Sequence, residues 1–378
     1  MFRWVKFPST HIISFLQNDP SLIVRVISSN ANESHVVSYL VNNCGLSPKS
    51  ALSASKYVSF KTPKKPDSVL AFFEAHGFSK THIATLIRKR PTVLLADPEK
   101  TLMPKLQFLH SNGFSSSDIA KVLCVCPEIL HTSLEKQIIP AFNVIKTFLP
   151  SHEKVVCAIK RLPRIMLSHL ETYVLPNIKI LEESGLPKSS IAWLLRYQPA
   201  TFMTSSNRFS EIVEEVKGMG LNPLSVNFVA AIHAVRAMST STWKSKIDIY
   251  KKWGWSEEEI LVAFGKHPWC MMGSEKKITA AMDFYINKMG WDSSYIAQHP
   301  VLISLGLDKR IVPRCSVIQV LLSKGLMKQT RFSSPLIISE ESFLHKFVTP
   351  YEEEVPHLLK LYREKLEIAK CKDMEKGG

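Results

Sequence analysis

Proline recurs along the chain at a fixed interval, and this spacing constrains the fold more than any other feature. The four prolines separated by 36 residues are Pro91, Pro127, Pro163 and Pro199. A second series follows thirteen residues later, with members Pro104, Pro140 and Pro176, and Pro313 stands in the same relation to Pro300. Periods of about 20 to 50 residues are typical of arrays in which each repeat packs against its neighbours. The sequence therefore predicts a repeat array.

Other residue types keep the phase of these prolines. Acids lie eight residues after the first proline of a unit, and they are Glu99, Glu135, Glu171 and Asp308. Apolar pairs follow the same prolines, and they are Leu94 and Leu95, Ile129 and Leu130, Ile165 and Met166, and Leu302 and Ile303. Glycines keep a matching interval at Gly45, Gly77, Gly113, Gly185, Gly220, Gly254, Gly290 and Gly325. Val235 replaces a proline and Leu149 a glycine, which leaves those two turns in doubt.

Local signals place the first helix of each unit. Gly113 closes one helix, and Ser115 with Asp118 forms a capping box that opens the next. Apolar residues then follow on one helical face. Proline lacks an N–H donor and disfavours helical geometry in its predecessor, so this helix ends before Pro127. Segment 253–260 repeats the arrangement.

A second helix follows a short apolar turn. The phased acid favours a helix N-terminus, and the second proline fits the first helical turn, where a missing N–H is tolerated. Each unit is therefore expected to contain two helices and a connecting turn. No strand pattern of comparable quality is present, so the fold class is all-α. About eight or nine units are expected over residues 35–350.

The two ends of the chain differ from this array. Residues 1–34 are poor in acids and carry Arg3, Lys6 and Arg25, which is typical of an organellar transit peptide; a disordered leader is the alternative. Residues 351–378 carry seven acids and six bases and are expected to form a charged C-terminal tail, a solvated helix with a frayed end.

The net charge of +15 favours a polyanionic partner, either nucleic acid or an anionic membrane surface. No apolar run reaches the length of a bilayer span, so no membrane association is expected. The seven cysteines form no CxxC pair, and His267 with Cys270 has no second pair, so neither a disulfide framework nor a metal site is expected. No nucleotide-binding or hydrolase motif is present, which argues against an enzyme and against a cofactor.

Basic residues gather just before the motif prolines. In a stacked array, one repeated position becomes a line of side chains, and lysine and arginine in such a line can follow a phosphate backbone. The helix dipole also favours cations at helix C-termini, which is the competing interpretation. Cys124, Val125 and Cys126 interrupt the line. The candidate nucleic-acid-binding residues are Arg88, Lys89, Arg90, Lys160, Arg161, Arg164, Arg196, Lys266, Lys309, Arg310 and Arg314.

Tryptophans also recur beside the glycines, at Trp253, Trp255 and Trp291, and Trp269 follows a motif proline. Their rings can stack on bases, as in proteins that bind single strands. The periodic placement favours packing between repeats instead.

Several segments resemble the mitochondrial transcription termination factor (mTERF) family in its land-plant branch. They include KTPKKPDSVLAFFEAHGFSKTHI at 61–83, RKRPTVLLADPEKTLMPKL at 88–106, WGWSEEEILVAFGKHPWCMM at 253–272 and KRIVPRCSVIQVLLSKGL at 309–326. The resemblance implies a curved α-solenoid of stacked motifs, each with two α-helices and a short 3-10 turn. It also implies an organellar protein that acts on nucleic acid.

Three functions remain open at this point. The first is a monomeric, double-stranded DNA-binding regulator of transcription, including termination, in the mitochondrion or alternatively the chloroplast. The second is an organellar RNA-binding factor in intron splicing or rRNA maturation. The third, from another class, is an α-solenoid scaffold that binds protein.

Overall fold

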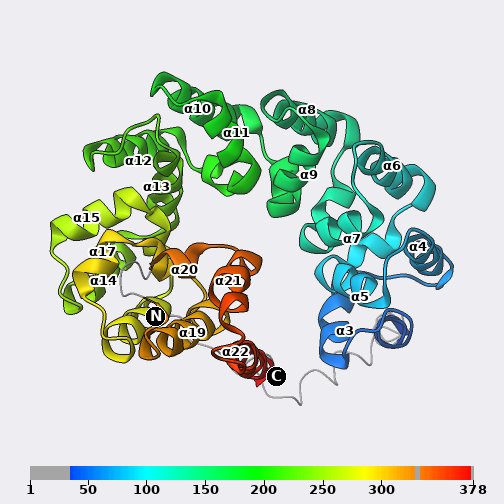
Figure 1. The fold of residues 1–378 in the computed structure, drawn as a ribbon. Helices are drawn as coiled ribbons and strands as arrows, with labels where there is room; N and C mark the ends of the chain where they lie inside the picture. Colours follow the sequence, from blue (N-terminus) through cyan, green and yellow to red (C-terminus); the bar gives the residue numbers. More distant parts are fainter. Residues whose placement is uncertain (1–34, 328–332, 376–378) are drawn as a thin grey trace, which may run out of the picture. The chain divides into compact units, whose positions relative to one another are not determined.

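The computed structural model describes residues 35–327 and 333–375, and helices form all the regular structure of this part (Figure 1). No strand occurs among these described residues, so the all-α prediction is confirmed. The expected leader, residues 1–34, lies outside them. The chain divides into two compact units. Unit 1 holds residues 1–175 and 195–203, and unit 2 holds residues 176–194 and 204–378.

Two kinds of helix alternate in unit 1. We call the helix that follows the glycine turn the opening helix, and the helix that follows the proline turn the closing helix. The opening helices are α3 (Pro48–Ser55), α5 (Lys80–Lys89), α7 (Ser116–Val125), α9 (His152–Arg161) and α11 (Lys188–Tyr197), whose last three residues belong to this unit. The closing helices are α4 (Lys64–Ala75), α6 (Met103–Ser111), α8 (Ile139–Phe148) and α10 (Leu170–Glu183), of which only residues 170–175 belong to this unit, and a further helix at 35–42 precedes the first glycine turn. Figure 1 shows α5, α7 and α9 in one row and α4, α6 and α8 in another.

Serine caps and glycine turns define the start of the opening helices. Ser115 and Asp118 form the expected capping box, and Ser256 with Glu259 forms another. All eight phased glycines have positive φ, for example +90° at Gly113, a conformation that L-residues with a side chain rarely adopt. Leu149, the exception, is buried in extended conformation at φ −117°, so its turn takes another path.

A 3-10 turn begins at each motif proline of unit 1, as expected, whereas a short α-helix, α18 (Val301–Ser304), follows Pro300. In unit 1 these turns are η2 (Pro91–Leu95), η4 (Pro127–His131), η6 (Pro163–Leu167) and η7 (Pro199–Met203). Their buried apolar pair corrects one part of the sequence register. Val93 and Leu94 are fully buried, whereas Leu95 is only half-buried. In the repeat of Pro91, as in the other repeats, the buried pair therefore begins two residues after the proline. This is one residue earlier than the predicted pair of Leu94 and Leu95.

The closing helices begin earlier than predicted. A π-helical turn precedes the α-helix, at η3 (Pro98–Leu102) and η5 (Leu134–Ile138) in unit 1. The N–H of Met103 donates to the carbonyl of Pro98, five residues back. Pro104 lies in the first turn of α6, as expected, whereas Pro176 lies inside α10. The wider turn changes the hydrogen-bonding register immediately before a residue that has no N–H to donate. The phased acids do lie in the first turn, as expected.

Unit 2 continues the alternation. Its opening helices are α13 (Val226–Ala237), α15 (Glu257–Lys266) and α17 (Ser293–Gln298). Its closing helices are α12 (Ser206–Gly218), α14 (Thr240–Lys252), α16 (Glu275–Asp283) and α19 (Val312–Ser323). The shorter elements are η8 (Pro268–Met271), η9 (Phe284–Lys288), α18 (Val301–Ser304), η10 (Leu307–Ile311), α20 (Ser333–Ile337), α21 (Glu340–Phe347) and η11 (Thr349–Tyr351). Val235 lies inside α13, so no 3-10 turn forms where the proline is replaced.

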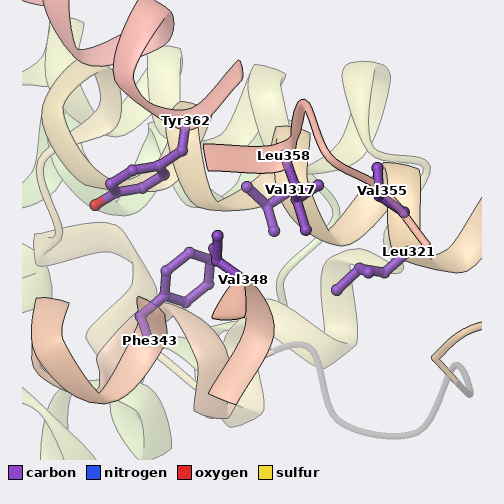
Figure 2. Close-up of a cluster of buried hydrophobic side chains, with 7 residues drawn as sticks. All are labelled: Val317, Leu321, Phe343, Val348, Val355, Leu358 and Tyr362. Carbon is purple, nitrogen blue, oxygen red and sulfur yellow. The ribbon is translucent and has the colours of Figure 1, made fainter. Parts of the chain in front are cut away.

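The C-terminal helix α22 (Leu358–Glu375) completes unit 2. Its residues Leu358 and Tyr362 enter a buried apolar cluster with Val317 and Leu321 of α19 and Phe343 of α21 (Figure 2). One face of the segment expected to be a solvated tail is therefore buried. This face covers the last closing helix, as a terminal cap in a repeat array does.

Polar side chains of the closing helices reach forward to the proline turn of the next repeat. The donor and acceptor pairs are Lys105 to Leu130, Gln137 to Met166 and Ser168, Asn177 to Thr204, Lys246 to Met271, and Arg314 to Pro335, Leu336 and Ile338. Each acceptor is a backbone carbonyl oxygen at or just after the turn. Carbonyls at helix ends lack partners within their own helix, so these bonds satisfy them while linking successive repeats.

Candidate nucleic-acid interface

The candidate basic residues of unit 1 lie at the C-termini of its opening helices or in the turn that follows. We call them the cationic row: Arg88, Lys89, Arg90, Lys160, Arg161, Arg164 and Arg196. Six are exposed and Arg196 is half-buried. Contacts link equivalent positions of successive repeats. Lys89 Nζ is 3.4 Å from the carbonyl oxygen of Val125, and the guanidinium of Arg161 lies 5.3 Å from the ring centre of Tyr197. These contacts join the end of α5 to that of α7 and the end of α9 to that of α11, so the row lies at one repeated position with an uncharged repeat at α7.

The C-terminus of α7 carries no cation, but a lysine of the preceding repeat reaches it. Lys89 extends over the end of this helix and donates to the carbonyl oxygens of Cys124, at 2.7 Å, and Val125. The Val125 side chain itself is 60% exposed. The uncharged residues at the end of α7 therefore interrupt the row, as expected from the sequence. Lys89 nevertheless places a positive charge beside them.

Glu128 shows how close the charges of distant repeats come. Burial raises the pKa of its carboxyl group, but hydrogen bonds from its own backbone and the Cys126 thiol, with the charges of Arg164 and Arg90, hold the pKa below its usual value. Arg90 and Arg164 come from repeats on either side of Glu128. Sequence inspection did not identify this carboxylate as part of the row, although it directly follows Pro127.

Part of the cationic row is already engaged by carboxylates. Lys160 forms an ion pair with Asp118 and holds the pKa of that carboxyl group below its usual range. Arg196 forms an ion pair with Glu153 at 3.0 Å, and its guanidinium lies 4.9 Å from the ring centre of Tyr197. These contacts pair the end of one opening helix with the start of the previous one. Because exposed ion pairs contribute little to stability, they tune the charge of the row more than they hold the fold.

The cationic row contains four exposed arginines, Arg88, Arg90, Arg161 and Arg164. The guanidinium group presents five donors in a fixed planar fork, a geometry that suits phosphate oxygens. Such groups at repeated positions can contact phosphates of one strand. These four side chains present cationic donors, and none of them is a nucleophile or general base.

The four candidates in unit 2 divide differently. Lys266 and Lys309 are exposed. Arg310 and Arg314 instead donate to backbone carbonyls at the end of α20, and Arg314, only 2% exposed, lies 4.8 Å over the ring of Phe343. These two arginines hold the C-terminal cap together. We therefore do not include them in the binding surface proposed below.

Two of the four candidate tryptophans, Trp255 and Trp291, pack inside the array as expected, whereas Trp253 and Trp269 are half-buried. Trp255 stacks on Tyr250 with ring centres 4.5 Å apart, and Trp291 stacks on Tyr285 in the same way at 5.1 Å. Both tryptophans are buried, which confirms that they are packing residues. The tyrosine hydroxyls donate to carbonyls of the following proline turn, at Cys270 and Leu302.

Other kinds of site find little support in the described residues. There, no three His, Cys, Asp or Glu side chains converge in a way that would suit a metal ion. His267 Nε2 pairs with the Ser304 hydroxyl at 2.8 Å, and Cys270 is buried. Within the same ranges, none of the helices has the length and apolar character needed to cross a bilayer.

Comparison with known proteins agrees with the helical repeats. The mTERF family model matches this chain over residues 70–279 and again over residues 143–344. The chain is also similar to the chloroplastic transcription termination factor MTERF8 of Arabidopsis thaliana, with 24% identity over 166 residues. This match covers 44% of the chain and 32% of the relative, so the chain spans about a third of that protein.

Proposed function

Because the chain belongs to the mTERF family, we propose that it binds nucleic acid through the cationic row of unit 1. Its target is double-stranded DNA, and the process it regulates is organellar transcription, including termination. The observation that carries this proposal is the set of exposed arginines at one repeated position of two repeats: Arg88 and Arg90, and Arg161 and Arg164. Unit 2 separately carries the exposed candidates Lys266 and Lys309.

The organelle we propose is the chloroplast. Composition of the leader does not distinguish a plastid from a mitochondrion, and the mitochondrion was the first expectation. The chloroplastic relative favours the alternative. Fusion of residues 1–34 to a fluorescent protein tests this, since chloroplast import supports the proposal and exclusive mitochondrial import rejects it.

Binding through phosphates has a quantitative signature in salt. Each phosphate contact on B-DNA lowers the slope of log K against log salt by about 0.9, so replacing all four arginines with alanine should flatten that slope by about 3 to 4. The matched control replaces four exposed lysines outside the cationic row, in α4, η5 and α8, namely Lys64, Lys65, Lys136 and Lys146. Equal effects of the two sets would reject the cationic row as the binding surface.

Competition distinguishes the remaining alternatives. Duplex DNA and structured RNA of matched length are titrated against a labelled duplex at one fixed salt concentration. Stronger competition by RNA would redirect the proposal to splicing or rRNA maturation. Absence of salt-dependent binding to either polymer would favour the protein-binding scaffold, because contact with phosphates necessarily releases counterions.

A further inference from the structure

A pocket opens between the first two opening helices of unit 1, at the start of the cationic row. Its volume is about 290 Å³. Its walls are Tyr57, just beyond the end of α3, and the segment that ends α5 and begins η2, with Arg88, Lys89, Arg90 and Thr92. Ser53 of α3 adds a second hydroxyl. The pocket combines an aromatic ring, hydroxyl groups and cations, the chemistry that recognises a nucleotide.

Tyr57 occupies the same position in its repeat as the central cations of the row. It lies ten residues after Ser47, the N-cap of α3, as Lys89 lies ten after Ser79 and Arg161 ten after Ser151. The tyrosine is therefore the aromatic member of the line. Its side chain is 69% exposed, so its ring can accept a partner without any rearrangement of the core.

Tyr197 provides an internal comparison. It lies two residues before its motif proline, as Lys89 and Arg161 do, and its ring is contacted by the guanidinium groups of Arg161 and Arg196. Among the described residues, no guanidinium group lies over the ring of Tyr57. Lys89 directs its ammonium group to α7, so the guanidinium groups at the pocket are those of Arg88 and Arg90.

We propose that this pocket binds one unpaired nucleotide, with its base stacked on Tyr57 and its phosphate held by Arg88 and Arg90. The inference rests on the proposed function and adds a preference for single-stranded ends or openings. A base inside a duplex is stacked on both faces and cannot meet the ring. Aromatic stacking combined with a positive groove is how proteins hold single strands without reading sequence. The volume lies at the small end of the range for ligand pockets, which suits one nucleotide.

The test uses the full chain and two DNA probes. One is a blunt duplex, and the other is the same duplex with a short single-stranded overhang containing 2-aminopurine, whose fluorescence falls when it stacks. Wild-type protein should bind the overhang probe more tightly, by about 5- to 150-fold, and quench its fluorescence. Tyr57→Ala should lose both the preference and the quenching, whereas Tyr57→Phe should keep them. Tyr173→Ala removes an exposed tyrosine of α10 outside the row and should behave as wild type.

The outcomes separate the two proposals. Equal affinity of wild-type protein for blunt and overhang probes, with normal salt dependence, would overturn the pocket and leave the proposed function standing. Loss of the preference in Tyr57→Phe would also overturn it, because the stacking ring is intact in that variant. Absence of salt-dependent binding to both probes would instead reject nucleic-acid binding itself.

Discussion

The ammonium nitrogen of Lys105 lies 2.5 Å from the carbonyl oxygen of Leu130, in the proline turn of the next repeat. Lys105 is only 6% exposed, and burial lowers the pKa of its ammonium group. Lys246 repeats this arrangement in unit 2, with its ammonium nitrogen 2.5 Å from the carbonyl oxygen of Met271. A buried lysine with a backbone acceptor thus joins consecutive repeats in both units.

Replacing Lys105 by methionine should lower the free energy of unfolding by about 1 to 3 kcal/mol. Methionine keeps most of the side-chain volume, but it leaves the Leu130 carbonyl without its donor in a buried site. Urea denaturation of the two proteins measures the difference. Lys100→Met, at an exposed position of η3, serves as the control. A Lys105→Met protein of unchanged or higher stability would show that desolvation of the ammonium group outweighs its hydrogen bond.

Truncation of Arg314 and of Arg164 should have opposite effects on stability and on nucleic-acid affinity. Arg314→Ala removes the buried donor to the carbonyls of Pro335, Leu336 and Ile338, so it should destabilise the protein by about 2 to 3 kcal/mol. Its effect on nucleic-acid affinity should be small while the protein remains folded. Arg164→Ala, at an exposed site, should change stability by less than about 0.5 kcal/mol and weaken binding. Denaturation and binding titrations on both variants check this, and a reversed pattern would contradict it.

Restoring the missing motif proline should harm the protein. Val235 lies inside α13, so proline there removes a helical donor and clashes with the preceding turn. We expect Val235→Pro to lower the free energy of unfolding by about 3 kcal/mol or more. Val235→Ala separates this backbone effect from loss of the buried side chain. A neutral or stabilising effect in thermal denaturation would mean that the chain turns at Val235 as it does at Pro199.

His233 should make unit 2 sensitive to acid. Burial, with the charge of Arg236, lowers the pKa of its imidazole to about 4, from an ordinary value of 6.5. As the pH falls below 6.5 the unfolded chain takes up the proton first, so stability declines until the pH reaches the folded pKa. Between pH 7 and pH 4.5 this should remove about 2 to 3 kcal/mol.

The same measurement on His233→Phe isolates this contribution. Phenylalanine keeps a planar ring near Trp269, whose ring centre is 5.6 Å from that of His233. Changes shared by the carboxylates cancel when the two proteins are compared. Identical acid dependence in both would assign the loss to other groups.

Much of the repeat could be predicted because its signals act over a few residues. A serine three residues before an acid, a glycine in a left-handed turn and a proline after a helix each act locally, and Ser115, Gly113 and Pro127 all did so as expected. The π turn before Pro104 was missed because it depends on the register of hydrogen bonds, which the order of residue types does not display.

The site was harder to predict because the role of a cation depends on what the next repeat presents to it. Arg164 follows a motif proline in η6 and is exposed, whereas Arg314 follows a second-series proline in α19 and donates to carbonyls more than twenty residues ahead. The flanking of Glu128 by Arg90 and Arg164 likewise arises from stacking, not from the order of residues along the chain.

The hydrogen bonds from closing helices to the following proline turn all point the same way along the chain. Lys105, Gln137, Asn177, Lys246 and Arg314 each serve a carbonyl that is synthesised later than its donor. During translation, every such turn therefore leaves the ribosome after the side chain that completes it. Each repeat supplies the acceptor for a donor that the preceding repeat has already presented. The array can therefore be assembled from its N-terminal end as it is synthesised.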